Sequence, residues 1–537
     1  MIIEKIKVIN YKIFKEKVIE LNDNVNIFVG ENDAGKSTIL EIISLITSGK
    51  INGANIDRQI TANMFNFDTR NEYIKKIQNK EFAELPSIII EAYCKQDNNS
   101  SYKGTNNSLG EDCPGISFYC RFNKDNATAY KEKLAKNEIL DIPLEFYETK
   151  FYSFNGDGIV SRYLPFKTAV IDTSKKDYSG LINKFISENM EQFLSDEDRM
   201  NLRSEYRNNT MNFKNINSIQ QLNKKLEENV RINDKKISIN LKEENIDSWK
   251  ENMEISVNDI PFSNIGFGSQ NTIKIELALR NEKDMVDTII VEEPENNLCY
   301  TNMIKLIAKI EENTNKQIFI ATHSSFVANK LDLQNIHVVY DGEINSLKNL
   351  KQDTRDYFKK LPGYDTLRVI LANKVILVEG PADELIIQRA YLDKNGKLPI
   401  EDGIDVITVN ALAFKRYCDI ALLINKNITI VTDNDGNIQE NILDKYGEYL
   451  EKKEITICYE EDETLNTLEP AVLYANTENG NVTDIFINAI SKNGSMKGKS
   501  IEEIKAFMLK NKTEWSMRVF DYSENIKYPQ YIMDAIK

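Results

Sequence analysis

The chain has 537 residues, a length that predicts two to four domains. Hydrophobic residues make up 41% and charged residues 28%, as in ordinary globular proteins. The net charge of −15 argues against a generally basic coat for nucleic acid but is compatible with a local basic groove. No apolar run approaches the ~18 residues of a membrane helix, and the six cysteines and two histidines lack the spacing of a zinc site. We therefore expect reduced thiols, a cytoplasmic location and no membrane partner.

The first thirty residues alternate apolar and polar side chains, which predicts edge strands and not a signal peptide. The strand Ile27–Gly30 leads into a glycine-containing loop from which a helix should start, and Ile88–Lys95 is typical of a later strand. Residues 97–112 are polar and predict a loop. Residues 174–252 carry apolar side chains at helical spacing among charges, with almost no glycine. This pattern predicts a helical insertion between two halves of one domain, which we expect to serve dimerisation.

The first motif is GENDAGKS, which fits the pattern GxxxxGK[ST] between an expected strand and an expected helix. Glycines let backbone N–H groups surround phosphates, and the helix N-terminus adds positive potential. Lys36 would reach the terminal phosphates of ATP, and Ser37 would hold Mg²⁺. A simple glycine-bearing turn is the alternative, which the strand–helix context disfavours. The predicted nucleotide-binding residues here are Gly30, Asn32, Gly35, Lys36, Ser37 and Thr38.

Two later strands end in residues that suit ATP hydrolysis. Thr288–Asn297, TIIVEEPENN, is an expected buried strand followed by two acids. Glu292 suits water-mediated Mg²⁺ ligation, and Glu293 suits activation of the hydrolytic water, although a solvated acidic turn would explain this segment taken alone. The next expected strand, Ile318–Ser325, ends at His323, which could sense the γ-phosphate. A lone histidine is usually structural, but this one closes the expected strand that follows the acidic strand.

A fourth segment, GFGSQ, opens an expected helix just before the acidic strand. A glycine-flanked helix start is an anion site, and a simple turn and cap is the alternative. The predicted residues are Gly266, Gly268 and Gln270. Together the four segments resemble the ABC-type ATPases of the SMC and OLD (overcoming lysogenization defect) kind. The resemblance implies a homodimer in which this segment of one protomer covers ATP bound to the other. Glu292 stands in place of the usual aspartate, as it does in OLD-like proteins. Gln59 is only a weak candidate for the glutamine of the usual glutamine loop.

The C-terminal third contains two runs of strand-forming residues that end in acids, Val375–Glu384 and Ile430–Asn437. In a parallel α/β sheet such acids lie at the carboxyl ends of strands, where ligands bind. Carboxylates gathered there repel one another unless hard cations lie between them. Mg²⁺ or Mn²⁺ held in this way can clamp a phosphodiester for cleavage. A solvated acidic loop surface is the alternative interpretation.

The same third resembles the Toprim domain of OLD-family nucleases over Leu361–Leu392, Val406–Ile424 and the second acidic run, although Asn410 and Ala411 stand where many Toprim proteins have glycine. The resemblance implies that Glu379 ligates metal and could assist proton transfer. It also implies a lysine that steadies the transition state, for which Lys497 is the candidate, with Lys499 close behind; a solvated surface cation is an equal alternative for either. The implied metal ligands are Glu379, Asp383, Asp433, Asp435 and Glu469.

These observations predict an α/β chain in which an ABC-type, SMC-like ATPase domain with a helical insertion precedes a Rossmann-like Toprim domain. The expected divisions are 1–173 and 253–345 for the ATPase halves, 174–252 for the insertion, 346–370 for a linker and 371–537 for the Toprim domain.

The expected function is an ATP-regulated DNA endonuclease that uses two Mg²⁺ or Mn²⁺ ions for hydrolysis and a further Mg²⁺ with ATP. The resemblance further implies anti-phage defence, either alone or with a helicase partner as in Gabija systems. The alternatives are an SMC-like DNA-binding scaffold with an inert Toprim domain, a primase or topoisomerase, and, least favoured, an ABC transporter subunit. The chain lacks the zinc module usual in such primases and an obvious domain to present a topoisomerase tyrosine.

Overall fold

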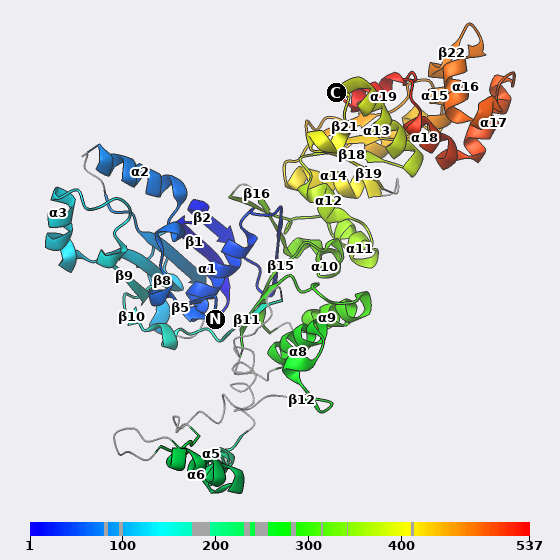
Figure 1. Ribbon diagram of the computed structural model, residues 1–537. Coiled ribbons are helices and arrows are strands. Elements are labelled where there is room, and N and C mark those ends of the chain that lie inside the picture. The colour runs from blue at the N-terminus through cyan, green and yellow to red at the C-terminus, as the bar shows by residue number, and fades with distance from the viewer. Residues whose placement is uncertain are drawn as a thin grey trace.

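The computed structural model describes residues 1–79, 84–95, 100–173, 194–229, 237–241, 256–280, 286–312, 315–340, 342–409 and 413–537. Figure 1 shows an N-terminal part built around two sheets and a C-terminal part built around a third. The helix-rich C-terminal end, in red, lies far from the N-terminal strands, in blue. Within the described residues, no helix is both long and apolar enough to cross a membrane.

The central sheet of the N-terminal part has the order β11-β14-β15-β3-β16-β17. Its first five strands are parallel, and β17 pairs antiparallel with β16 at one edge. The strands are almost continuously apolar, as expected for a parallel sheet covered on both faces. Their bounds are β3 Val25–Gly30, β11 Thr168–Asp172, β14 Thr288–Glu292, β15 Gln317–Ala321, β16 Ile336–Tyr340 and β17 Glu343–Ser346.

The second sheet is antiparallel and contains the N-terminal strand. Its order is β10-β9-β8-β6-β1-β2, with β7 paired to β8. The expectation of edge strands is correct for β2 but wrong for β1, which pairs with both β2 and β6. Alternation reports which faces of a strand are buried and not whether its edges are paired. The bounds are β1 Ile3–Tyr11, β2 Phe14–Glu20, β6 Ile88–Cys94, β7 Lys103–Gly104, β8 Cys113–Phe122, β9 Tyr147–Ser153 and β10 Gly158–Ile159.

Helix α1, Lys36–Ser48, packs between these two sheets. It is apolar on most of its circumference, which is typical of a helix buried on all sides. The opposite face of the central sheet is covered by α8 Phe267–Arg280, α9 Tyr300–Glu312 and α10 Ser325–Lys330. This layering places the start of α1, at Lys36, beyond the carboxyl end of β3, with residues 31–35 between them.

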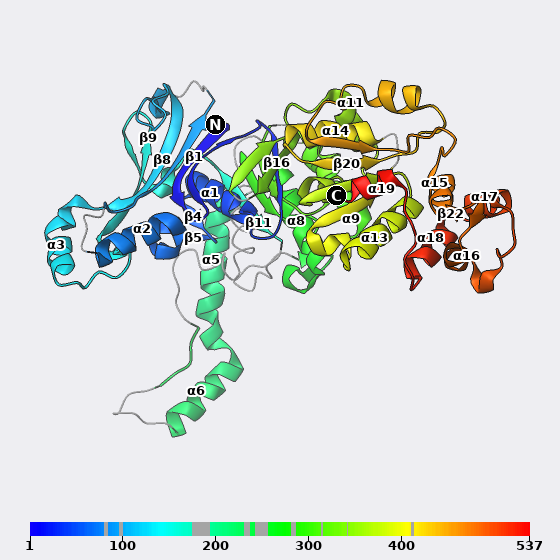
Figure 2. The ribbon, with the colours of Figure 1, turned by 90° about the horizontal axis from the view of Figure 1, so that it is seen from above.

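The described part of the predicted insertion consists of α5, Asp196–Asn212, and α6, Asn217–Asn229. Ser195 begins α5 with a capping box to Asp198, and no described residue of α5 is buried. Figures 1 and 2 both show these two helices lying away from the sheets. Residues 181–193, which carry much of the helical apolar pattern of 174–252, lie outside the described residues. Dimerisation through 174–252 stays a prediction.

The C-terminal sheet is parallel throughout, in the order β19-β18-β20-β21. Helix α13 packs on one face with α16, α18 and α19, and α14 packs on the other. The strands are β18 Lys374–Val378, β19 Ile404–Thr408, β20 Ile428–Val431 and β21 Ile455–Cys458. The helices are α13 Pro381–Asn395, α14 Phe414–Leu423, α15 Leu468–Ala475, α16 Asp484–Ile490, α17 Ile501–Lys510, α18 Lys512–Asp521 and α19 Gln530–Ala535.

The segment expected as a linker contains two helices, α11 Gln352–Lys360 and α12 Thr366–Leu371. Phe358 and Val369 from these helices are buried in one continuous apolar cluster with residues of the central ATPase sheet and of the C-terminal sheet. The two parts of the chain therefore share a core across this segment. A short polar segment in the sequence does not reveal such packing, because only a few apolar side chains carry it.

Candidate functional site: two acidic strand ends joined by helices

The acids of the C-terminal sheet lie where two neighbouring strands end. Glu379 directly follows β18, and Asp433 follows β20, which pairs with β18. The chain leaves β18 toward β19 on one side and leaves β20 toward β21 on the other side. Strands that diverge in this way open a crevice at their carboxyl ends, the usual ligand site of such sheets. Asp383 belongs to the first turn of α13, which starts at the same edge.

Hydrogen bonds hold these acids to each other's loops. One oxygen of Glu379, Oε1, accepts from the Thr432 hydroxyl and from the Asp433 N–H at 3.2 Å. Oδ2 of Asp383 accepts from the Gly380 N–H at 3.1 Å and so caps its own helix. The three acids therefore belong to one bonded assembly at the strand ends.

Hydrogen bonds to the loop after β21 hold the turn from Asp433 to Asp435 in place. Asn434 is fully buried, and its amide donates to the carbonyl oxygens of Glu460 at 2.7 Å and Asp462 at 3.1 Å. The backbone of Asp435 has a φ of 48°, a left-handed conformation. Its N–H donates to the carbonyl of Asn466 at 3.1 Å. The turn is thus built to hold two acids on either side of a buried anchor.

The charges of these acids act on one another. Burial, followed by the charges of Glu379 and Glu469, raises the pKa of Asp383 to about 7. Burial, followed by the charges of Asp383 and Glu379, raises the pKa of Asp433 to about 8, with smaller contributions from Glu469 and Asp435. All five predicted ligands therefore interact through space, and their shared charge opposes ionisation of two of them.

Glu469 adds a contact that the sequence did not reveal. Its side chain is 1% exposed, Oε2 accepts from the Thr467 hydroxyl at 3.0 Å, and Oε1 lies 3.5 Å from Nζ of Lys512. Lys512 begins α18, and no motif surrounds it. Lys497 instead pairs with Asp484 at 3.8 Å, and its side chain is 72% exposed; Lys499 pairs with Glu503. The lysine in contact with the acid cluster is therefore Lys512.

The donor set suits a hard cation, because carboxylate oxygens are the preferred ligands of Mg²⁺ and Mn²⁺. Within the described residues, however, no three His, Cys, Asp or Glu side chains already converge closely enough to hold an ion. The reason is visible in the hydrogen bonds: oxygens of Glu379 and Asp383 are directed at Thr432 and Gly380. The residues fit the implied metal in the chemistry of their donor atoms, and their side chains would have to turn toward one another to hold it.

The phosphate loop lies at the carboxyl end of β3 in the ATPase part. Nζ of Lys36 donates to the carbonyls of Gly30 at 3.0 Å and Glu31 at 2.8 Å, and Gly35 adopts a φ of 109° that favours glycine. The Ser37 hydroxyl donates to Oε1 of Glu292. Burial lowers the pKa of Lys36, while nearby carboxylates act in the opposite direction. In the same segment Asn32 is exposed and Thr38 is half-buried.

Glu293 and His323 face each other beside this loop. Oε1 of Glu293 lies 3.9 Å from Nε2 of His323, and Oε2 accepts from the Asn296 amide at 2.5 Å. Glu293 has a φ of 49°, and the Thr173 hydroxyl donates to the carbonyls of Glu292 at 2.7 Å and Glu293 at 2.6 Å. Thr173 and Asn296 thus position the acidic pair; Asn296 belongs to the acidic segment itself, whereas Thr173 belonged to no recognisable motif.

The glycine segment at the start of α8, Gly266 to Gln270, makes contacts within its own chain. The Gln270 side chain is buried and donates to the carbonyls of Phe262 at 2.9 Å and Ile265 at 3.1 Å, so it holds the preceding turn. A Cβ atom on Gly268 would lie 2.1 Å from the carbonyl oxygen of Asn297, while Gly266 has open space around it. Of the three, Gly266 is the residue best placed to face a second molecule.

The helices α10 to α12 connect the segment that carries His323 with the C-terminal sheet. Helix α10 starts two residues after His323, and the Ser325 hydroxyl donates to Asp365 at 2.5 Å. Asn329 donates to the carbonyl of Tyr364 at 2.8 Å and accepts from the Thr366 hydroxyl at 2.5 Å. The segment that carries His323 is thereby tied to α12.

From α12 the contacts continue into the C-terminal sheet. Arg368 pairs with both oxygens of Asp405 in β19, at 2.6 and 2.7 Å. Lys426, before β20, donates to the carbonyl of Ile370 at 2.6 Å. Burial lowers the pKa of Lys426 to about 8, and the opposing charge of Glu31 comes from the phosphate loop itself. These polar contacts therefore reach the amino-terminal ends of β19 and β20, at the edge of the sheet opposite Glu379 and Asp433.

Both parts of the chain match known protein families. Residues 1–328 match the family model of the AAA ATPase domain, and residues 370–435 match the Toprim domain of overcoming lysogenization defect protein-like proteins. These matches confirm the predicted fold class, an α/β ATPase domain followed by a Toprim domain.

Individual relatives match only part of the chain. The DNA replication and repair protein RecF of Clostridium kluyveri is 32% identical over 155 residues, 28% of this chain and 41% of that protein. RecF of Clostridium beijerinckii is 26% identical over 156 residues, 28% of this chain and 40% of that protein. The chain thus spans about two-fifths of the length of the curated relatives it matches. The SMC head domain from Thermotoga maritima is 14% identical, with a TM-score of 0.32 over 65% of this chain and 99% of that domain.

The raised pKa values give a testable dependence on pH. Because Asp383 and Asp433 hold protons in the folded state up to about pH 7 and 8, their contribution to stability is present at acidic pH and lost as the pH rises through these values. A divalent cation requires the ionised carboxylates. We therefore expect Mn²⁺ to raise the unfolding temperature strongly at about pH 8.5 and weakly at about pH 5.5. At ~100 times Kd the gain is about 2.7 kcal/mol.

Differential scanning fluorimetry measures this shift directly. Asp433→Asn should abolish it, whereas Asp484→Asn, at an exposed position in the same domain, should retain it. An equal shift at both pH values, or its survival in Asp433→Asn, would contradict metal binding by the cluster.

Proposed function

The chain belongs to the AAA ATPase domain family and carries an overcoming lysogenization defect protein-like Toprim domain behind it, and from this premise we propose that it is an ATP-regulated, divalent-metal-dependent DNA endonuclease. The observation that carries the proposal is the cluster of mostly half-buried, mutually repelling carboxylates after β18 and β20. Such perturbed acids in a crevice are typical of functional sites. The position at the divergence of two strands supports a phosphodiester as ligand.

Each residue of the cluster has a proposed role. Glu379, Asp383, Asp433, Asp435 and Glu469 would hold the metal ions, which supply Lewis acidity and lower the pKa of bound water when present. Glu379 is oriented by the Thr432 hydroxyl and also lies where it could accept a proton from the attacking water. Lys512, beside Glu469, would stabilise negative charge on the phosphate oxygens.

Each residue of the ATPase site also has a proposed role. Lys36 and the backbone of its loop would bind the phosphates, and Ser37 and Glu292 would hold Mg²⁺. Glu293 would orient the hydrolytic water, with His323 as its neighbour on the γ-phosphate side. A homodimer with Gly266, Gly268 and Gln270 of one protomer near ATP of the other follows from the resemblance, and the open space at Gly266 supports it. A role in anti-phage defence, with or without a helicase partner, rests on the same resemblance.

A second candidate is a DNA-binding ATPase scaffold with an inert Toprim domain. The likeness to RecF, which covers 28% of this chain, favours it. The side-chain oxygens turned toward Thr432 and Gly380 would then represent the permanent state of the acids. Burial of a complete carboxylate set without a cation would be destabilising at neutral pH, which argues for the nuclease.

Plasmid cleavage tests the proposal. Supercoiled DNA incubated with the purified protein and Mg²⁺ or Mn²⁺ should be nicked or linearised by the wild type and left intact by Glu379→Ala. Glu502→Ala, at an exposed position in the same domain, should cleave normally. A Lys36→Ala variant shows whether ATP stimulates or restrains cleavage. Intact plasmid in every reaction, with ATP hydrolysis preserved, would support the scaffold.

The two candidate lysines can be separated by substitution. We expect Lys512→Ala to lower the cleavage rate by ~100-fold, the order found when one charge-stabilising donor is removed from an active site. Lys497→Ala should cleave like the wild type, because its side chain is exposed and pairs with Asp484. Initial rates at saturating Mn²⁺ measure both. The reverse ranking would restore Lys497 as the functional lysine.

The contacts of α10 and α12 predict how ATP reaches the nuclease. Ser325→Ala removes the hydroxyl that bonds Asp365 but no buried apolar contact. We expect it to retain ATP hydrolysis and basal cleavage while reducing the effect of ATP on cleavage by several-fold, equivalent to ~0.5–2 kcal/mol of coupling.

The comparison variant is Gln352→Ala, on the exposed side of α11, where the side chain bonds only within its helix. It should leave the ATP effect unchanged. Rates of both reactions measured with and without ATP provide the readout. An unaltered ATP effect in Ser325→Ala would exclude this contact from the coupling.

A further inference from the structure

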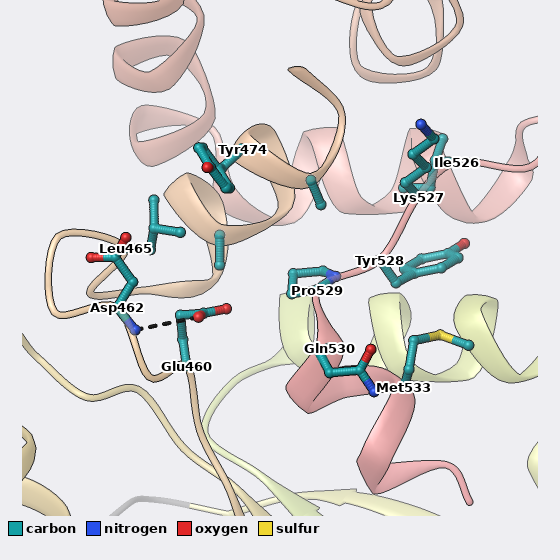
Figure 3. Close-up of a pocket in the computed structure, with 12 residues that line it drawn as sticks. Glu460, Asp462, Leu465, Tyr474, Ile526, Lys527, Tyr528, Pro529, Gln530 and Met533 are labelled. Atoms are coloured by element: carbon teal, nitrogen blue, oxygen red, sulfur yellow. Dashed lines mark hydrogen bonds between the residues drawn. The ribbon is translucent and has the colours of Figure 1, made fainter. Parts of the chain in front are cut away.

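A cavity of about 630 Å³ lies on the Toprim domain between α15, the segment before α19 and the loop that follows β21. Its size falls within the ~300–1,000 Å³ of pockets that bind small molecules. Figure 3 shows Tyr474 on α15 and Tyr528 to Gln530 on the segment leading into α19, with Glu460 and Asp462 on the loop opposite. None of these residues has a role in the proposed hydrolysis.

The cavity adjoins the acid cluster through two walls. The backbone carbonyls of Glu460 and Asp462 accept hydrogen bonds from the buried side-chain amide of Asn434, the residue between Asp433 and Asp435. Helix α19, which supplies Gln530, packs against β20, the strand that leads to Asp433. Its next residue, Tyr531, is buried, and burial together with the charge of Asp433 raises its pKa well above the usual range. The cavity and the acid cluster therefore share the loop after β21 and helix α19 as walls.

The lining selects the chemistry of the ligand. Leu465, Pro529 and Met533 form apolar walls, and the Tyr474 ring is 67% exposed. The Tyr528 ring is held in place by its hydroxyl, which donates to Asp393 at 2.5 Å. Two aromatic faces and apolar walls suit a flat heterocycle.

The polar groups of the lining narrow the choice further. Carboxylates of Glu460 and Asp462 would repel a phosphate but can accept hydrogen bonds from exocyclic amino groups, and the Gln530 amide can donate as well as accept. A neutral nucleobase fits all of these features. The nucleobase would belong to the same strand as the phosphate at the acid cluster, because the cavity and the cluster share the loop that holds Asn434.

We propose that this cavity receives an unstacked nucleobase of the DNA strand whose phosphate lies at the acid cluster. The inference rests on the proposed nuclease function and specifies its substrate. A base can enter only after it leaves the stack, which is easiest where it is unpaired or mismatched. The protein should therefore prefer DNA with single-stranded gaps, flaps or mismatches next to the cut over fully paired DNA.

A fluorescent base tests the inference. DNA with 2-aminopurine in a short single-stranded gap, and a fully paired duplex of the same sequence, are titrated with the full-length protein. We expect the gapped DNA to bind at least about tenfold more tightly, with the fluorescence changed on binding. Tyr474→Ala should weaken binding of gapped DNA by about tenfold and remove the fluorescence change. Tyr163→Ala, an equally exposed tyrosine of the ATPase part, should do neither.

A second variant guards against indirect effects of losing the ring. Ala475→Trp keeps Tyr474 but fills the cavity from the same helix, and it should also abolish the preference for gapped DNA. Equal binding of gapped and paired DNA by a wild type that still cleaves would overturn the cavity proposal and leave the nuclease intact. Loss of cleavage and DNA binding in every protein would overturn both. Binding of free adenosine as tight as that of gapped DNA would assign the cavity to a small molecule and overturn the inference.

Discussion

Parallel strands end at one edge of their sheet, and both candidate sites of this chain depend on that constraint. In the ATPase part it gathers Lys36, Glu292 and His323 from three strands whose sequences lie far apart. In the Toprim part it gathers Glu379 and Asp433. The helices that follow these strands start at the same edges, so their N-termini face the same ligands.

Like charges close together at the carboxyl ends of β18 and β20 destabilise the ionised form of the acid cluster when no cation is present. The raised pKa values of Asp383 and Asp433 show that the folded protein keeps protons there which free aspartate would release. Native chains tolerate such local conflicts mainly at functional sites. Binding of a divalent cation would relieve the conflict, and any turn of Glu379 and Asp383 toward the ion would then couple metal binding to the Thr432 loop and the start of α13.

Much of this arrangement could be predicted from the sequence because it is local. The strand, glycine loop and helix around Lys36, and the acids after β18 and β20, follow from patterns of a few residues. Contacts made by tertiary packing left no such signal. Lys512 is one lysine among many until α18 brings it to Glu469. The inward position of Gln270, the pairing of β1 on both edges and the buried faces of α11 and α12 likewise depend on partners that periodicity does not identify. Asn410 and Ala411 lie outside the described residues.

The shared core around α10 to α12 gives the ATPase and Toprim parts a physical connection. Ser325 and Asn329 follow His323 directly, and their partners lie on the segment that bonds Asp405 and Lys426 of the Toprim sheet. A displacement of His323 upon ATP binding or hydrolysis would reach β19 and β20 without passing through the insertion.

The most direct test of the central claim is a crystal structure of the protein grown with Mn²⁺, with anomalous scattering recorded to locate the ions. The account predicts anomalous density between Glu379, Asp383 and Asp433, with their oxygens turned away from Thr432 and the Gly380 N–H. Well-ordered acids that keep these hydrogen bonds, with no anomalous density beside them at millimolar Mn²⁺, would contradict it.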